Sequence, residues 1–347
     1  ASLRCDDRGV GGSGGAYFAS TMDDLAVDAK AALGFLRARP EIAQGSVGIL
    51  GHSEGGLIGP KVAVTDPSVS FLVLLSPPGE PLRALLERQD RAILKLAGAE
   101  DDLIDRVMVA AAENVALAAD LSLSKERLEE KLRALAKIQA LRFNEAERAR
   151  LGMNEAQLEA SLQTAMSPWF RSLIHEDPAA TLRQIKIPTF ALFGTKDAQV
   201  EPQISSQIVR SSLGGAGNLD FEVSILPGLN HFFQHAETGG FGEYASIEET
   251  MSPEVLRLVG DWISAHSKAR PISNPRSLRI ENARLIDGTG APARMGSVRI
   301  VDDRIVEVGA VGELAPVPGE EVLDAHGLVL APGFIDTHSH AVSDLFE

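Results

Sequence analysis

VGILGHSEGG, residues 47–56, is the segment from which we predict the fold. The apolar residues Val47–Leu50 indicate a strand and a helix is expected from about Gly55, so the G-x-S-x-G pattern of residues 51–55 lies in the turn between them. A serine hydroxyl is a weak nucleophile until a base removes its proton, and such a turn exposes it to a base. We therefore predict that Ser53 is a nucleophile rather than part of an incidental Gly-Ser turn.

The residues around this serine suit a tight turn. Positions 51 and 55 are expected to require glycine, because the turn brings the strand and the helix close together. The backbone amide of Glu54, at the start of the helix, can point at negative charge that develops on a substrate oxygen. The sequence therefore predicts the Glu54 amide as one donor of an oxyanion hole.

The flanking segments alternate between strand and helix patterns. Strands are predicted at Phe71–Leu75, Pro188–Phe193 and Phe221–Leu226, and helices near Pro202–Ser211 and Pro253–His266. Such alternation is typical of a parallel sheet with helices on its faces, so we predict the α/β class.

A long segment without proline, between Pro81 and Pro168, interrupts the alternation. It holds two glycines, and its Leu and Ala residues recur at helical spacing among charged residues, as in LEEKLRALAKIQALRF. We predict several helices here. Their apolar faces favour core packing over an acyl-chain pocket, because such a face needs burial whatever it binds.

Two later turns supply an acid and a base. In folds built around this serine turn, the acid and then the histidine follow along the chain, each after a later strand. FALFGTKDAQVEP places Asp197 in a turn, and FEVSILPGLNHFF places His231 in a loop. We predict that His231 shuttles the proton of Ser53 and that Asp197 orients and stabilises His231. The alternative for Asp197 is a solvent-exposed turn carboxylate.

The other histidines fit the role of base less well. His235 is the alternative base because it lies in the same predicted loop as His231. His52 neighbours the serine but is expected to point elsewhere. His175 lies near the end of the helical segment, and His266 is expected at a helix end.

The composition excludes several classes of function. The 48 acidic residues outnumber the 33 basic ones and give a net charge of −15, which repels nucleic acid and anionic membrane surfaces. We find no apolar run of about 18 residues and no signal peptide, so no membrane span is expected. Cys5 is the only cysteine and cannot form an internal disulfide. The compartment and the oligomeric state stay open.

The C-terminal part differs in pattern. Residues 267–277, SKARPISNPRS, contain two prolines and three basic residues and predict a linker, which we place at 268–277. From residue 278 onward, short β segments alternate with Gly and Asp turns. We therefore predict one domain at 1–267, with the helical segment at 81–183, and a β-sandwich-like segment within 278–347.

Three separated motifs carry a resemblance to a known family. LRCDDRGVGGSGG (3–15), GHSEGGLIGP (51–60) and LNHFFQHAETG (229–239) together resemble bacterial α/β-hydrolases of the serine-aminopeptidase-like or dienelactone-hydrolase-related type. The resemblance covers residues 1 to about 267. It implies hydrolysis of small-molecule carboxylic esters, occasionally of peptides or amides, without a cofactor, and it makes 81–183 a helical cap over the active site.

The sequence departs from that family in two places. The family's first three strands, and the Gly-rich loop with the second oxyanion donor, would precede Ala1, so we expect an N-terminally truncated sheet. Loss of one such donor costs about 100- to 1000-fold in rate, so low activity is expected. Cys5 stands where an aromatic residue is usual. Asp6, Asp7 and Arg8 are interpreted as a structural turn rather than as catalytic residues.

A second resemblance lies in the C-terminal part. NARLIDGTGAPARMGSVRIVDDRIVEVG (282–309) and HGLVLAPGFIDTHSHAV (326–342) resemble the opening of amidohydrolases of the D-aminoacylase and dihydroorotase type. The resemblance implies that His338 and His340 are ligands of zinc or another divalent metal. Alternate residues of a strand share a face, which would direct both imidazoles to one ion. A stable zinc site needs three or four ligands, so we expect this one to be incomplete.

Three functions remain open from the sequence. The first is a serine hydrolase that cleaves esters through Ser53, Asp197 and His231. The second is a metal-dependent amidohydrolase of N-acylated amino acids, encoded in a longer fusion of which this chain would be an internal piece. The third is an inactive fragment that associates through unpaired strand edges.

Overall fold

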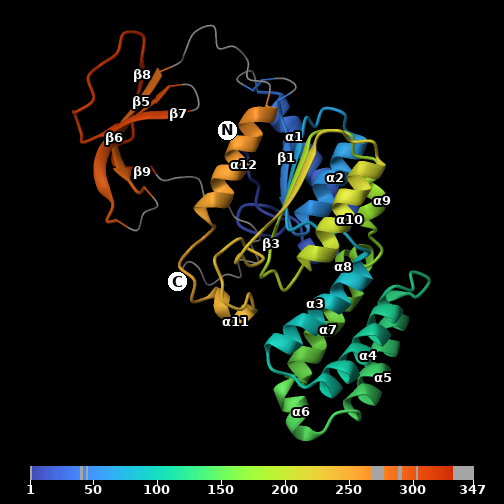
Figure 1. Ribbon diagram of the computed structural model, residues 1–347. Coiled ribbons are helices and arrows are strands. Elements are labelled where there is room, and N and C mark those ends of the chain that lie inside the picture. Colours follow the sequence, from blue (N-terminus) through green and yellow to red (C-terminus); the bar gives the residue numbers. More distant parts are fainter. Residues whose placement is uncertain are drawn as a thin grey trace. The chain divides into compact units, whose positions relative to one another are not determined.

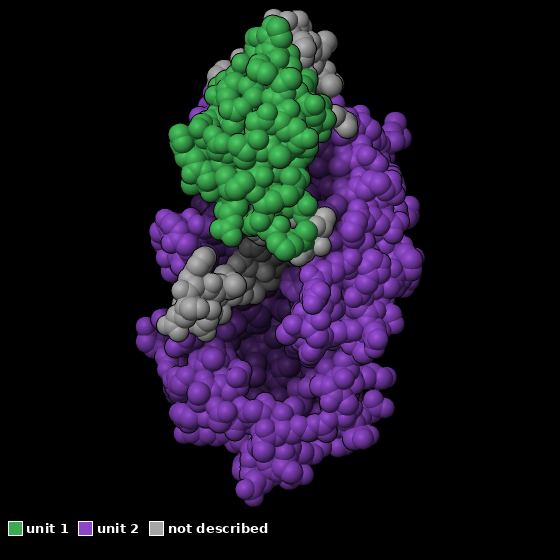
Figure 2. Space-filling view, turned by 90° about the vertical axis from the view of Figure 1, so that its left-hand side faces the viewer, with its two compact units in different colours: residues 1–3, 269–339 green, residues 4–268, 340–347 purple. Residues whose placement is uncertain are grey.

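The structure, a computed structural model, describes residues 2–39, 42–43, 46–267, 277–287, 291–301 and 304–330. It contains two compact units, shown in different colours in Figure 2. Residues from Arg4 to Ser267 belong to the larger unit, and residues from Ser277 to Leu330 belong to the smaller one. In this described part of the chain, no helix is both long enough and apolar enough to cross a membrane.

The larger unit is built on a sheet of four parallel strands that lie side by side in chain order (Figure 1). The strands are β1 (Ile49–His52), β2 (Leu72–Leu75), β3 (Thr189–Gly194) and β4 (Phe221–Leu226). Every residue of β2 and β3 is buried, as expected for central strands of a parallel sheet that is covered on both faces. Because the strands are parallel, the turns that follow them all lie at one edge of the sheet.

Helices cover both faces of this sheet. One face carries α1 (Met22–Arg37), α2 (Gly55–Thr65) and α10 (Pro202–Gly215), and the other carries α12 (Pro253–His266) (Figure 1). Successive side chains of a strand point to opposite faces. Leu72 and Leu74 of β2 therefore pack into the core with α1, α2 and α10, whereas Val73 and Leu75 pack with α12.

Local sequence explains where these helices begin. Thr21 precedes α1, and its hydroxyl accepts a hydrogen bond from the Asp24 amide while the Asp24 carboxylate accepts one from the Thr21 amide. This reciprocal capping satisfies amides that have no partner inside the helix. Helices α10 and α12 both begin with a proline, which is favoured in the first turn because its missing N–H is not needed there.

A group of seven helices lies between β2 and β3 and forms the cap. They are α3 (Leu82–Leu96), α4 (Asp101–Ala118), α5 (Lys125–Ala140), α6 (Glu145–Arg150), α7 (Glu155–Met166), α8 (Pro168–Leu173) and α9 (Pro178–Leu182). The buried Leu128 and Leu132 of α5 pack against Leu162 of α7 in a separate small core. Core packing within the cap is therefore seen for α5 and α7, whereas Leu82 and Leu85 of α3 pack into the core beside the sheet.

Two short helices complete the list of elements in the larger unit. The 3-10 helix η1 (Tyr17–Ala19) precedes α1 and contacts α8 of the cap. Helix α11 (Phe241–Tyr244) follows the loop after β4.

The smaller unit is a mixed sheet with the strand order β7-β6-β5-β8, in which β9 also pairs with β5. Its strands are β5 (Ser277–Leu285), β6 (Arg294–Val301), β7 (Arg304–Gly309), β8 (Glu321–Asp324) and β9 (Val329–Leu330). β5 pairs antiparallel with β6 but parallel with β8 and β9. Ile280, Ala283, Leu285 and Val298 form most of its buried core.

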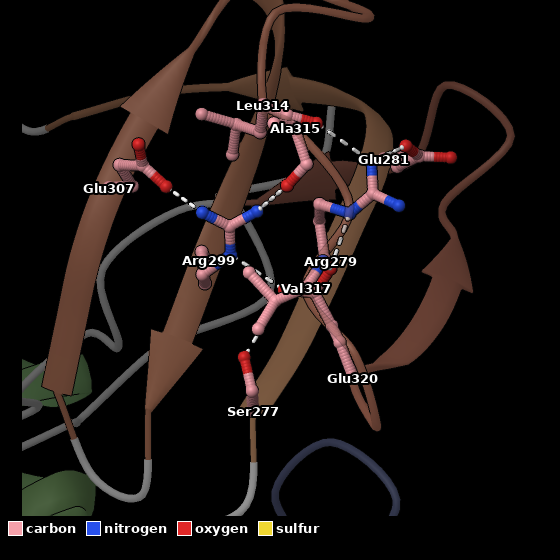
Figure 3. A network of polar contacts seen from close by, with 9 residues as sticks. All are labelled: Ser277, Arg279, Glu281, Arg299, Glu307, Leu314, Ala315, Val317 and Glu320. Atoms are coloured by element: carbon pink, nitrogen blue, oxygen red, sulfur yellow. Dashed lines mark hydrogen bonds and ion pairs between the residues drawn. The ribbon is translucent and has the colours of Figure 1, made fainter.

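Two arginines of this sheet bind one buried carboxylate (Figure 3). Nε of Arg279 on β5 lies 2.8 Å from one oxygen of Glu320, and Nε of Arg299 on β6 lies 2.6 Å from the other. The Glu320 side chain is 1% exposed. The two guanidinium groups also donate to the carbonyl oxygens of Leu314 and Ala315. These contacts hold the segment between β7 and β8 against the sheet.

The predicted fold class is confirmed. The parallel sheet, its flanking helices, the helical cap and the β-rich C-terminal segment are all present. Three strands begin later than predicted. β1 spans Ile49–His52 rather than Val47–Leu50, β2 begins at Leu72 rather than Phe71, and β3 spans Thr189–Gly194 rather than Pro188–Phe193. β1 ends in the polar but buried His52, so a run of apolar residues does not mark its end.

Candidate active site

Ser53 lies in the turn between β1 and α2 in a backbone conformation that is uncommon for a residue with a side chain. Its φ is 54°, in the left-handed region, where contact between Cβ and the backbone makes most residues unfavourable. Its amide donates to the carbonyl of Leu75 at 2.9 Å, which fixes the turn at the end of the sheet. The structure therefore places the predicted nucleophile on a strained and anchored turn, as expected for a functional serine.

The two glycines of the turn differ in how much space surrounds them. A Cβ atom on Gly51 would come within 2.1 Å of the Gly55 carbonyl oxygen, so only glycine fits there. A Cβ atom on Gly55 would meet nothing within 4 Å. The expectation that close packing requires both glycines is therefore correct for Gly51 and wrong for Gly55.

The predicted acid and base contact each other. Asp197 lies in the turn after β3 and His231 in the loop after β4, and Nδ1 of His231 is 2.8 Å from Oδ2 of Asp197. The other carboxylate oxygen accepts the amides of Gln199 and Val200, at 2.8 and 2.9 Å. Both side chains are buried. The interpretation of Asp197 as a solvent-exposed turn carboxylate is therefore wrong.

The surroundings of Asp197 keep it ionised. Burial alone would raise the pKa of this carboxyl, but its electrostatic interaction and hydrogen bond with His231, together with the Val200 amide, hold its pKa below the usual range. A carboxylate that accepts Nδ1–H leaves Nε2 of His231 as the atom that can take a proton.

His52 connects the base loop to the serine turn. Its Nε2 lies 2.8 Å from the carbonyl oxygen of His231, and the two imidazole centroids are 4.7 Å apart. Because a carbonyl oxygen only accepts, Nε2 of His52 donates this hydrogen bond. The expectation that His52 points elsewhere is therefore wrong. Among the hydrogen bonds of the described residues, none joins the hydroxyl of Ser53 to His231, a contact that often forms only when substrate binds.

The alternative histidines have other partners or positions. Nδ1 of His235 lies 2.9 Å from Glu249, and its side chain is 64% exposed. His266 stacks on Trp262, with ring centroids 3.8 Å apart. His175 is exposed at the end of α8. His231 is thus the histidine that the structure brings beside both the acid and the serine turn.

The side chain of Glu54 has a role that the sequence did not indicate. Its carboxylate accepts hydrogen bonds from the Tyr17 hydroxyl and from Nε1 of Trp169, the latter at 2.5 Å. Tyr17 belongs to η1 and Trp169 to α8 of the cap. Glu54, predicted for its amide alone, therefore also joins the serine turn to two other parts of the unit.

The N-terminal turn is held by its own polar contacts. The Arg8 guanidinium donates to both oxygens of Asp28 on α1, at 2.5 and 2.9 Å, and to Ser20. Asp6 accepts the Gly12 amide at 3.1 Å. These contacts support the structural interpretation of residues 6–8. Cys5 is exposed.

The predicted metal ligands, His338 and His340, lie outside the described residues. Within the described ranges, no group of three or more His, Cys, Asp or Glu side chains is arranged to hold a metal ion.

The chain is similar to known proteins of both groups that the sequence resembles. The family model described as serine aminopeptidase S33 matches residues 1–158. Esterase EstD of Thermotoga maritima is 24% identical over 237 residues, which cover 68% of this chain and 46% of the esterase. A solved esterase structure from Pyrococcus furiosus has 15% identity and a TM-score of 0.39, covering 74% of this chain and 65% of that one.

The second set of matches is short but closer in sequence. The N-acyl-D-aspartate deacylase of Alcaligenes xylosoxydans xylosoxydans is 54% identical over 61 residues, 18% of this chain. This chain therefore spans only 12% of that deacylase's length. The predicted resemblance to two groups of hydrolases is confirmed, and the family evidence supports a hydrolytic enzyme.

Proposed function

We propose that the larger unit is a serine hydrolase that cleaves carboxylic esters, with Ser53 as nucleophile, His231 as base and Asp197 as the residue that orients the base. The observation that carries this proposal is the buried pair of His231 and Asp197, 2.8 Å apart, in a loop that is hydrogen-bonded to the residue before Ser53. The match of residues 1–158 to the serine aminopeptidase S33 family model supports the role of Ser53, whereas Asp197 and His231 lie beyond the matched residues.

The chemistry follows from these positions. Oγ of Ser53 attacks the ester carbonyl carbon while Nε2 of His231 takes its proton, and the carbonyl oxygen becomes an oxyanion facing the Glu54 amide. The intermediate collapses, and the alcohol leaves with the proton from His231. Water then attacks the acyl-enzyme, gives its proton to His231 and releases the acid, and Ser53 regains its proton. Asp197 stabilises the imidazolium form of His231 in both halves of the cycle.

A fluorophosphonate probe tests this proposal without knowledge of the substrate. The probe should label the wild-type chain, and both Ser53→Ala and His231→Ala should abolish labelling, because phosphonylation requires an activated serine. His235→Ala is the matched control and should label like the wild type, since His235 is exposed and paired with Glu249. Equal labelling of Ser53→Ala would contradict the assignment.

A second activity is favoured by a separate observation. We propose that the smaller unit belongs to a metal-dependent amidohydrolase of N-acylated amino acids, because the chain is 54% identical over 61 residues to an N-acyl-D-aspartate deacylase. His338 and His340 would supply two imidazole ligands. Two ligands are fewer than zinc requires, so we assign no reaction step to a metal.

Metal dependence tests the second activity. If it is present, hydrolysis of an N-acyl-D-aspartate by this chain should be abolished by a chelator and restored by zinc, and His338→Ala with His340→Ala should prevent the restoration. Hydrolysis that is insensitive to the chelator would contradict this proposal. The absence of both activities would contradict both proposals.

A further inference from the structure

The Glu54 carboxylate joins three segments that are far apart in the sequence. Trp169 is separated from Glu54 by 115 residues and Tyr17 by 37, yet both donate a hydrogen bond to it. Glu54 itself lies directly before the first residue of α2. One side chain therefore connects the serine turn, the segment before α1 and the cap.

The groups around this carboxylate favour a stable contact. The rings of Tyr17 and Trp169 lie 5.7 Å apart, and Phe18 packs edge-on against Trp169 at 5.4 Å. Burial, and then the charge of Glu54, raise the pKa of the Tyr17 hydroxyl, so it stays protonated and remains a donor. Hydrogen bonds to a charged acceptor in partly buried surroundings are stronger than those between neutral groups.

We infer that Glu54 is a positioning residue, and that its hydrogen bonds with Tyr17 and Trp169 hold the start of α2 so that the Glu54 amide faces the oxyanion. The amide and the carboxylate belong to one residue, so fixing the side chain restricts the rotation of its backbone. Because Trp169 is part of the cap, the position of the cap is then coupled to the geometry of the serine turn. This inference rests on the proposed serine chemistry.

The first test detects the hydrogen bond between Trp169 and Glu54 directly and does not depend on catalytic activity. The chain has two tryptophans, so its indole N–H groups give two resonances in a proton–nitrogen spectrum, and Trp262→Phe identifies the one from Trp169. Glu54→Gln should shift the Trp169 resonance upfield, because a neutral acceptor replaces a carboxylate, and should leave the Trp262 resonance in place. An unchanged Trp169 resonance would overturn the inference.

The second test measures kcat and KM for hydrolysis of a p-nitrophenyl ester. Glu54→Gln and Trp169→Phe should each lower kcat about 10-fold, with KM changed less than about twofold, because a misaligned donor weakens binding of the transition state alone. Trp169→Phe removes the donor while keeping a smaller aromatic side chain, and it leaves Glu54 intact, so it guards against a folding defect in Glu54→Gln.

A matched control breaks a different contact between the cap and the same helix. Glu176, between α8 and α9, pairs with Lys61 of α2 at 2.6 Å, and Glu176→Gln should leave kcat unchanged. If the wild type is not labelled by the fluorophosphonate, the serine chemistry is wrong. If the wild type is labelled but kcat is unaffected in Glu54→Gln and Trp169→Phe, the positioning role alone is wrong.

Discussion

The Asp197 carboxylate accepts three hydrogen bonds, from His231, Gln199 and Val200. Two of the donors are amides of its own turn, so the carboxylate is held in place before it contacts His231. An ionised and fixed acceptor selects the tautomer of His231 in which Nε2 is free to act as a base. The charge of Asp197, and not its shape alone, therefore matters for the proposed reaction.

Replacing Asp197 by Asn tests that requirement. The amide keeps the size of the side chain but cannot stabilise the imidazolium, so kcat for ester hydrolysis should fall by about 1,000- to 10,000-fold. Steady-state kinetics on a p-nitrophenyl ester would measure it. Asp220→Asn is the control, because Asp220 contacts His266 at 3.3 Å on the surface and should leave kcat unchanged. A fall of less than tenfold in Asp197→Asn would contradict the role of the charge.

Some contacts of individual residues could be predicted from the sequence and others could not. The turn around Ser53 and the positions of Asp197 and His231 after later strands follow from short motifs and from the order of elements. The side-chain contacts of His52 and Glu54 do not, because they join residues that are far apart in the sequence, by 179 positions for His52 and His231 and by 115 and 37 for Glu54 with Trp169 and Tyr17. Periodicity and local motifs carry no signal for such pairs.

Between elements, the carboxylate of Glu320 acts as a common acceptor for β5 and β6. Burial would raise the pKa of this carboxyl, but hydrogen bonds from Arg299, Val317, Arg279 and Ser277 lower its pKa from 4.5 to about 2. The two arginines would repel each other without it. Removal of one member of such a network leaves the remaining charges uncompensated, so the network stabilises the sheet as long as Glu320 is ionised.

This network predicts a pH dependence for the smaller unit. A carboxyl with a lowered pKa stabilises the folded state above about pH 4.5, and that contribution is lost as the pH falls toward 2. Glu320→Gln should reduce the protection of β5 and β6 amides in hydrogen exchange at neutral pH, and the difference from the wild type should shrink near pH 2. Hydrogen exchange is the suitable method because residues 277–330 contain no Phe, Tyr or Trp whose absorbance or fluorescence could report unfolding.

The neighbouring Glu321 provides the control for that prediction. Glu321 is exposed on β8, so Glu321→Gln removes the same charge one position away without touching the network. Its exchange protection should match that of the wild type at both pH values. Equal protection in the two variants would show that Glu320 makes no special contribution.

For the molecule as a whole, the sequence predicted the architecture better than the details. The boundaries of α12 were predicted to the residue and those of β4 likewise, because both elements have strong periodicity and clear polar or proline ends. The β-rich character of the smaller unit followed from its turn residues. Its mixed strand order, with β8 and β9 parallel to β5, did not follow, because pairing between distant strands leaves no local pattern.

The insertion of the cap between β2 and β3 has a consequence for the chain during its synthesis. β1 and β2 can pair as soon as both have left the ribosome, but β3 emerges only after the residues from Ser76 to Pro188 have been added. At about 5–20 residues per second this takes roughly 6 to 23 s. During that time the apolar edge of β2 lacks the strand that covers it in the finished protein, while the cap helices, with their own small core, can already fold.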